Sequence, residues 1–446
     1  MEHCRDGGRL LWREVLGLRR ILRYLVRLSL NSNILKYFSL QKLPFGLKVG
    51  DHYQSVTVLE SVIQQTGIYA RSRKGRLSVY WGDQVFLPSA PFVYEPSHHI
   101  DILCTLLGDT APTAEEWAAQ GLEKYGVIAC LETADGKMEA AQVEKVSHEV
   151  ATKMLGALGG TLKQVGPSLG SFSVSAAILK ALIEEFKEEL AGKEAKLDTD
   201  PHFWMPLTLS EADYVSLMKG KDVPEEESVK HHQRMTAMKA SFDLGGMGLF
   251  GAVDVGKEAC WWDYGQLKLY SANSLLLLEK SPSADLLRQF LGLDTHLADC
   301  ALDGVTVDDT SYAYNVQAAS GIISKSVLAS VRAQEIQADG AILVNCVAKK
   351  IVAGPGAILY NIMDDSDEGV VAKEGEVMVA VTEESGESMR LCSRMDIDGG
   401  QAWKRKLDMN EMSFEQVHKK NKNANIGEIQ KKRQAKFDAL ASSMGF

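Results

Sequence analysis

Two aspartates share a sequence context that suits the binding of a hard cation. Asp83 follows the apolar run LSVYW and a glycine in RLSVYWGDQVFLPS, and Asp263 follows two tryptophans in EACWWDYGQLKLY. Mg²⁺ is typically held in proteins by one or two carboxylates together with substrate phosphates. We therefore predict that Asp83 and Asp263 are Mg²⁺ ligands. The structural alternative for Asp263 is an N-cap in front of a helix that begins near Gln266.

Strands must position both aspartates. A strand that is buried on both faces has a continuous apolar sequence, and LSVYW fits this description. In parallel α/β sheets, ligands bind beyond the carboxyl ends of the strands. Gly82 would allow a ligand to approach the backbone closely there. Strand-like and helix-like segments alternate from residue 49 to residue 298, which predicts a mostly parallel sheet with helices.

Two segments between the aspartates contain further candidate residues. YGVIACLETADGKMEAAQVEKV has the pattern of two strands joined by a turn at its DG pair, and Glu144 and Lys145 close the second strand. VGPSLGSFSVS places Ser168–Gly170 before a short apolar strand and the helix AAILKALIEEFKEELAGK. Taken alone, Lys145 is better explained as a surface charge.

In this order, the segments resemble those of the sugar-1-phosphate nucleotidyltransferases, also called nucleotide-sugar pyrophosphorylases. Gly82-Asp83 stands where this family has a Gly-Asp at a strand end, and Tyr125–Val127 stands where it has a YGV strand. Glu144-Lys145 is similar to the EKP element of the family, although valine replaces the proline. Ser168–Gly170 is similar to its N-x-G turn, and Trp261–Gly265 to its W-x-D-x-G element.

The resemblance implies a fold, a reaction and roles for these residues. The fold would be a nucleotide-diphospho-sugar transferase-like α/β domain. The reaction would be the Mg²⁺-dependent transfer of a nucleotidyl group from a nucleoside triphosphate (NTP) to a sugar 1-phosphate. Asp83 and Asp263 would bind Mg²⁺, and Lys145 would meet the sugar phosphate. The substrate pocket would be lined by residues of the short motifs, namely Gly82, Gly126, Glu144, Ser168 and Gly170.

The residue pattern of the sequence changes after residue 300. Aliphatic residues recur four to six positions apart from Ile323 to Ile351, with glycine and small polar residues between them. This spacing predicts a β-solenoid, and the resemblance implies a left-handed β-helix; an ordinary antiparallel domain is the alternative. The absence of histidine between His296 and His418 argues against a solenoid acyltransferase. The predicted domains are an N-terminal segment (1–48), the nucleotidyltransferase-like domain (49–298), the solenoid (299–400) and a Lys-rich helical tail (401–446).

The N-terminal segment departs from the family. The family begins with a strand, a Gly-rich loop, an arginine and a Pro-Lys pair that hold the triphosphate, and we find none of these in order here. Instead, GGRLLWREVLGLRRILRYLVRLSL has the pattern of a basic amphipathic helix. Such a helix could contact a membrane surface weakly, serve as an organelle-targeting segment, or pack on the protein. Under the resemblance, three explanations compete: an altered or truncated enzyme, a divergent enzyme, or a non-catalytic relative that binds nucleotide sugars or regulates a partner.

Composition limits the remaining possibilities. The 446 residues carry a net charge of −10, which argues against nucleic acid as a partner. Seven scattered cysteines indicate a reducing compartment, so we expect a cytoplasmic protein or, if the N-terminal segment is a targeting sequence, an organellar stroma or matrix protein. No apolar run reaches the roughly 18 residues of a membrane span. The solenoid could mediate homo-oligomer formation.

Two other segments have weaker chemical patterns. EPSHHIDIL contains His98 and Asp101 three residues apart, which could share a metal on a helix face, but we expect a loop and helix start with solvated histidines. The histidine pair in VKHHQRM leads to the same expectation. DLGGMGLFGAVDVG lacks the spacing of a dinucleotide-binding motif and is interpreted as a flexible loop.

Overall fold

The computed structural model forms two compact units. It describes residues 42–49, 52–57, 75–79, 84–87, 95–108, 110–144, 146–156, 160–187, 205–220, 223–256, 259–397, 402–421 and 424–446. Described residues of the first unit lie within Val62–Trp81 and Phe86–Trp261. Those of the second unit lie within Asn33–Ser61, Gly82–Val85 and Trp262–Phe446. The predicted N-terminal amphipathic helix lies outside the described residues.

The first unit is built around a mixed six-stranded sheet with the order β7-β6-β8-β5-β9, in which β3 also pairs with β8. The strands are β3 (Arg76–Val79), β5 (His98–Cys104), β6 (Gly126–Glu132), β7 (Met138–Glu144), β8 (Thr161–Ser175) and β9 (Gly248–Asp254). Among these strands only β5 and β9 pair in parallel. The other pairs are antiparallel, and a tight turn joins one of them, β6–β7. The prediction of a mostly parallel sheet is therefore wrong for the described strands.

Helices cover both faces of this sheet. Alternate residues of β6 point to opposite sides: Ile128 and Cys130 join one buried cluster, and Val127, Ala129 and Leu131 join another. The first cluster also contains residues of α6 and α10, and the second contains residues of α4, α5 and α9. The helices of the unit are α4 (Ala114–Ala119), η2 (Leu122–Lys124), α5 (His148–Gly156), α6 (Ala176–Glu185), α8 (Met205–Thr208), α9 (Glu211–Lys219) and α10 (Glu225–Ser241).

Several predicted elements of this unit are confirmed. The segment from Gly126 to Glu144 forms the hairpin β6–β7, and Gly136 in its turn has the positive φ of 79° that favours glycine. The helix expected after β8 is α6, whose N-cap Ser175 accepts a hydrogen bond from the Ile178 N–H. By contrast, DLGGMGLFGAVDVG is not all loop, since its second half is strand β9.

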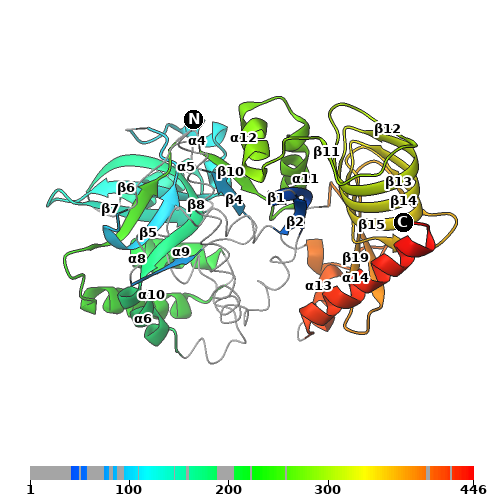
Figure 1. The fold of residues 1–446 in the computed structure, drawn as a ribbon. Coiled ribbons are helices and arrows are strands. Elements are labelled where there is room, and N and C mark those ends of the chain that lie inside the picture. The colour runs from blue at the N-terminus through cyan, green and yellow to red at the C-terminus, as the bar shows by residue number, and fades with distance from the viewer. Residues whose placement is uncertain are drawn as a thin grey trace. The chain divides into compact units, whose positions relative to one another are not determined.

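The second unit contains the predicted β-solenoid. Strands β13 (Tyr312–Ser324), β14 (Val327–Asp339) and β15 (Ile342–Ala353) pair in parallel and stack as successive turns (Figure 1). The other strands here are β1 (Lys42–Val49), β2 (His52–Thr57), β11 (Leu297–Ala298), β12 (Val305–Val307), β16 (Ile358–Tyr360), β17 (Met363–Asp364), β18 (Val370–Ala372), β19 (Glu376–Thr382) and β20 (Ser388–Arg394). β1 pairs with β2, and the solenoid sheet ends in the antiparallel pair β19–β20. Two further strands, β4 (Gln84–Leu87) and β10 (Cys260–Asp263), form a separate pair.

The regular spacing predicted from the sequence becomes stacked side chains in the solenoid. Val316 pairs with Val331, which pairs with Cys346, and all three are completely buried in its core. One corner of the solenoid is formed by residues with φ between 52° and 58°, namely Asn315, Ser330, Asn345 and Asn361. Asparagine tolerates this left-handed conformation better than most residues. Val347, an aliphatic residue within the same spaced series, belongs instead to a separate cluster that packs against the C-terminal helix.

Helices precede and follow the solenoid. They are α11 (Leu267–Leu275), η4 (Leu276–Leu278), α12 (Pro282–Leu291), η5 (Ala402–Lys404), α13 (Phe414–Lys420) and α14 (Ile426–Ser443). The predicted helical tail is thus confirmed, and α14 lies alongside the solenoid strands (Figure 1). Its buried side chains Phe437 and Ala441 pack against Val347 of β15, so the helix is anchored on the solenoid. Within the described ranges, no helix is both long and apolar enough to cross a membrane.

Candidate functional site

Three of the predicted site residues of the first unit come from different strands and lie in one row of its sheet. Gly126 at the start of β6 pairs with Glu144 at the end of β7. The register of β6 and β8, in which Val127 pairs with Pro167, puts Gly126 opposite Ser168. Ser168 in turn pairs with Cys104, the last residue of β5. These pairings align the start of β6, the end of β7, the end of β5 and the middle of β8 in one row across the sheet, which we call the rim.

The Ser168–Gly170 motif forms a bulge in β8 rather than the predicted turn before a strand. Between the pairs Ile102–Phe172 and Cys104–Ser168, β5 has one residue and β8 has three. Gly170 has a φ of 72°, and its N–H donates a hydrogen bond of 3.1 Å to the Ser168 hydroxyl. The motif was expected to end one element and begin another, but β8 pairs with neighbours on both sides and continues through it. Bulges of this kind often occur next to active sites, where they redirect side chains.

An aromatic pair lies beside the rim. Tyr125 precedes Gly126, and its ring centroid is 5.4 Å from that of Trp261 in an edge-to-face arrangement. Trp261 packs against a small buried cluster that includes Leu103 and Leu169. The rings are half-buried, so they offer an apolar surface to a ligand at the rim. The sequence motifs indicated Trp261 through its spacing to Asp263. They indicated Tyr125 only as part of the YGV strand.

Sequence reasoning missed Asp254 as a rim residue. Asp254 ends β9 and pairs with Cys104 in the same row. Its Oδ1 accepts hydrogen bonds from the Leu106 N–H at 3.1 Å and the Gly256 N–H at 3.0 Å, and the residue is exposed. The signal was present, since an apolar run followed by an aspartate near a glycine was the pattern used to select Asp83.

Asp263 closes strand β10 and belongs to the second unit. Its Oδ1 accepts a hydrogen bond of 2.7 Å from the Gly265 N–H, and its carbonyl accepts one of 2.6 Å from the Asn273 side chain. The N-cap of α11 is Gln266. The alternative role of Asp263 as that N-cap is therefore wrong, and the carboxylate instead closes a turn directly after the strand.

Other predicted residues fall outside the part of the chain that the structure describes. These are Gly82, Asp83 and Lys145, while Glu144 is described as a backbone position in β7 only. Their roles therefore stay predictions. Asp263 has the oxygen chemistry that Mg²⁺ prefers. Within the described residues, no group of three or more histidine, cysteine, aspartate or glutamate side chains is arranged to hold a metal.

His98 and Asp101 belong to strand β5, and the expected loop and helix start with solvated histidines is wrong there. Asp101 is 2% exposed and forms an ion pair of 3.0 Å with Arg76, whose side chain is 5% exposed. The His98 Nε2 hydrogen-bonds to the Met138 carbonyl at 2.8 Å. Burial lowers the pKa of His98, but Asp101, the Met138 carbonyl and Glu139 together raise it above its usual value. These contacts join β3, β5 and β7, which indicates a structural network.

The second histidine pair is also not solvated. His232 is 8% exposed, and its Nε2 hydrogen-bonds to the Leu209 carbonyl at 2.9 Å. His231 Nδ1 hydrogen-bonds to the Tyr214 hydroxyl at 2.7 Å. Both residues therefore hold α10 against the preceding segment, and neither forms part of a metal site among the described residues.

The thiols near the rim are poor candidates for nucleophiles. Burial raises the pKa of Cys104 well above its usual value, and burial raises that of Cys130 to about 11. A cysteine must be a thiolate to attack a substrate. Any chemistry at the rim therefore depends on hydroxyl, amide and carboxylate groups rather than on these sulfurs.

Comparison with known proteins does not identify the chain. No protein-family model matches its sequence, and no curated protein matches it.

Proposed function

We propose that the protein transfers a nucleotidyl group from an NTP to a sugar 1-phosphate, with release of pyrophosphate. The observation that supports this most directly is the rim, where Gly126, Glu144 and Ser168 from three strands share one row. The resemblance assigns these motifs to the substrate pocket. Strand pairing brings these motifs into one row, and the proposal is that a single substrate site uses them.

The proposed reaction requires little covalent chemistry from the protein. An oxygen of the sugar phosphate attacks the α-phosphorus of the NTP and forms a new P–O bond. The bond between the α-phosphorus and the oxygen that bridges to the β-phosphorus breaks. The attacking oxygen is already an anion, so no general base is needed, and pyrophosphate carries away the displaced electron pair. Catalysis then depends on alignment and on positive charge around the phosphates. Backbone and hydroxyl groups of the rim would contribute to alignment, and Mg²⁺ and Lys145 would contribute the positive charge.

Each proposed residue has a limited task. Ser168 and the backbone at Gly126 would orient the sugar, with Tyr125 and Trp261 as an apolar wall. Lys145 would pair with the sugar phosphate. Asp83 and Asp263 would hold Mg²⁺, which supplies charge neutralisation of the polyphosphate when bound.

The test is pyrophosphate release with Mg²⁺ from the full chain, with the common NTPs offered against a panel of hexose 1-phosphates. Release with one pair would support the proposal and name the substrates. Asp83→Asn and Asp263→Asn should each lower the rate at least about 100-fold without a change in melting temperature. Asp135→Asn, in the exposed turn of the β6–β7 hairpin, is the matched control and should keep the wild-type rate.

A non-catalytic relative that binds nucleotide sugars is the second candidate. The observation that favours it is the absence from the sequence of the Gly-rich loop and Pro-Lys pair with which the family holds the triphosphate. Folded protein that binds a nucleotide sugar but releases no pyrophosphate with any pair would replace the first proposal by this one. Protein that does neither would contradict both.

A further inference from the structure

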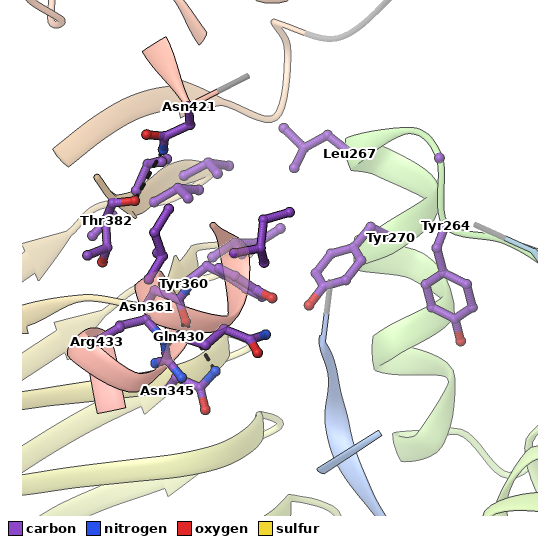
Figure 2. Close-up of a pocket in the computed structure, with 18 of the residues that line it drawn as sticks. Tyr264, Leu267, Tyr270, Asn345, Tyr360, Asn361, Thr382, Asn421, Gln430 and Arg433 are labelled. Atoms are coloured by element: carbon purple, nitrogen blue, oxygen red, sulfur yellow. Dashed lines mark hydrogen bonds between the residues drawn. The ribbon is translucent and has the colours of Figure 1, made fainter. Parts of the chain in front are cut away.

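A pocket of about 480 Å³ lies within the second unit, and its residues are distinct from those of the rim. Its walls come from the start of α11, the solenoid corner at Asn345 and Asn361, strand β19, and helix α14 (Figure 2). A pocket of this volume lies in the range that holds small organic molecules.

Most of the lining is apolar. Aliphatic side chains come from α11, β16, β19 and α14, namely Leu267, Ile358, Val377, Val379, Val381, Ile426 and Ile429. Transfer of an apolar ligand body from water to such a surface is favourable in proportion to the area that it buries. The lining therefore selects a ligand with a substantial apolar part.

One side of the pocket is polar and carries positive charge. Asn345, Asn361, Gln430 and Arg433 lie together there in Figure 2. Arg433 is the only charged side chain among the described lining residues. Its Nη1 donates to the Asn361 Oδ1 at 3.4 Å, and its Nη2 donates to the Gln434 Oε1 at 3.4 Å. Both hydrogen bonds are long, and no carboxylate of the described chain forms an ion pair with this guanidinium.

The neighbouring asparagines fix this side of the pocket. Asn345 is 6% exposed, and its Nδ2 donates a hydrogen bond of 3.1 Å to the Asn361 Oδ1, which also accepts from Arg433. The Asn345 Oδ1 accepts no hydrogen bond from any described residue. A guanidinium has five N–H donors in a planar fork that matches carboxylate, phosphate and sulfonate groups. Arg433 thus keeps donors for a ligand after its two protein contacts.

We propose that this pocket binds a small organic anion. The apolar body of the ligand lies against the aliphatic walls, and its acidic head group pairs with Arg433. Burial lowers the pKa of Arg433 from its usual value, while the nearby Tyr360 and Asp438 act in the opposite direction. A bound anion would favour the charged guanidinium further. The proposal does not depend on the reaction proposed for the rim.

The test compares two fluorescent probes that have similar aromatic bodies. 8-Anilinonaphthalene-1-sulfonate carries an anionic head group, and N-phenyl-1-naphthylamine lacks it. In fluorescence titrations of the full chain, the sulfonate probe should bind at least about 10-fold more tightly, because hydrogen bonds to a charged group are the stronger kind. Arg433→Gln should remove this preference and leave the affinity of the neutral probe unchanged. Lys436→Gln removes an exposed charge from the same helix and should change neither affinity.

Two further measurements keep the test decisive. If Arg433→Gln lowers the melting temperature strongly, Leu267→Glu is the alternative variant. It places a negative charge at a half-buried position of the pocket wall and should weaken binding of the sulfonate probe at least as much. Displacement by 1-naphthoate or by 1-naphthyl phosphate tells whether a carboxylate or a phosphate head group is preferred. Equal affinities of both probes with no effect of Arg433→Gln or Leu267→Glu would overturn the proposal, as would the failure of both probes to bind folded wild-type protein.

Discussion

The sheet of the first unit and the solenoid of the second unit differ in how far apart in sequence their paired strands lie. In the central turns of the solenoid, each strand pairs with a neighbour 15 residues further along, as Tyr312 with Val327 and Val327 with Ile342. In the first unit, β5 pairs with β8 and β9, which follow it only after long intervening segments. The solenoid therefore depends on one local rule repeated, whereas the sheet depends on particular residues that hold distant strands together.

The aspartates of the two regions show this difference. Asp101 lies within the sheet, almost completely buried, and pairs with the guanidinium of Arg76 from another strand. Asp308 lies at a solenoid corner, partly exposed, and accepts hydrogen bonds from the backbone N–H groups of Ser311 and Lys325, both at 2.7 Å. One carboxylate joins distant strands through a buried charge pair, and the other closes successive turns through backbone donors.

The largest expected effect is the loss of the buried pair in the first unit. Arg76→Met would leave the Asp101 carboxylate buried without its guanidinium and remove the bonds from Arg76 to Ser173 and the His98 carbonyl. Breaking a buried pair by removing one partner costs about 3–5 kcal/mol. We expect a loss of this size in the free energy of unfolding of the first unit, measured by denaturant titration.

An exposed ion pair of the same sheet provides the control for this substitution. Lys163 on β8 pairs with Glu132 on β6 at 2.6 Å, and both side chains are at least 40% exposed. Lys163→Met should cost less than about 1 kcal/mol, because solvent screens exposed pairs. Similar losses of unfolding free energy for Arg76→Met and Lys163→Met would show that the buried network does not hold this sheet together. The contrast between the sheet and the solenoid would then not rest on this network.

A smaller effect is expected at the solenoid corner, and it depends on pH. Burial raises the pKa of Asp308, but hydrogen bonds from Ser311, Lys325 and Thr310 together lower it below its usual value of 3.8. A carboxyl whose pKa is lowered in the folded state stabilises that state above its unfolded pKa, and this stabilisation is lost as the pH falls. At pH 7, Asp308→Asn should therefore cost about 1 kcal/mol, a modest value because the group is partly exposed.

The pH profile distinguishes this explanation from simple loss of packing. The free energy of unfolding of wild type should approach that of Asp308→Asn as the pH falls below about 4. Asp309→Asn changes the exposed neighbouring carboxylate and is the matched control. A difference between wild type and Asp308→Asn that stays constant from pH 7 to pH 3 would contradict a role of the charged carboxylate.

The same contrast explains how much of the fold could be predicted from the sequence. The solenoid was visible because each turn repeats one environment, so that Ile323, Val331, Ile336 and Ile351 all fill its core. The hairpin β6–β7 was visible because its turn is local. The directions of β5, β8 and β9 were not, since they depend on contacts between residues far apart in sequence.

The segment DLGGMGLFGAVDVG shows why such contacts escape sequence analysis. Its glycines suggested a loop, but a Cβ atom at Gly248 would lie 2.1 Å from the His98 ring, and one at Gly251 would lie 2.2 Å from it. The glycines are thus explained by a side chain on a partner strand about 150 positions earlier. His98 looked solvated for the same reason, because the carbonyl that its ring contacts belongs to Met138, 40 positions later on another strand.

The candidate site was predicted only in part for a related physical reason. Gly126, Glu144 and Ser168 could be chosen from short motifs, but their common row follows from strand register, which a motif does not encode. Asp254 enters the row only through the parallel pairing of β9 with β5. A segment interpreted as a loop has no register, so its aspartate could not be assigned to the rim.

A pair of glycine substitutions tests whether the bulge serves the rim. Gly170→Ala forces alanine to a φ of 72°, and Gly136→Ala in the β6–β7 turn forces it to 79°. Each should cost about 1–2 kcal/mol, because the left-handed conformation is strained for residues with a Cβ. Only Gly170 shares its bulge with Ser168, so only Gly170→Ala should weaken hexose 1-phosphate or nucleotide-sugar binding, by about 10-fold in titration calorimetry. Equal binding by the two variants would mean that the bulge shapes the sheet without shaping a site, and the rim would then resemble the solenoid corner in being purely structural.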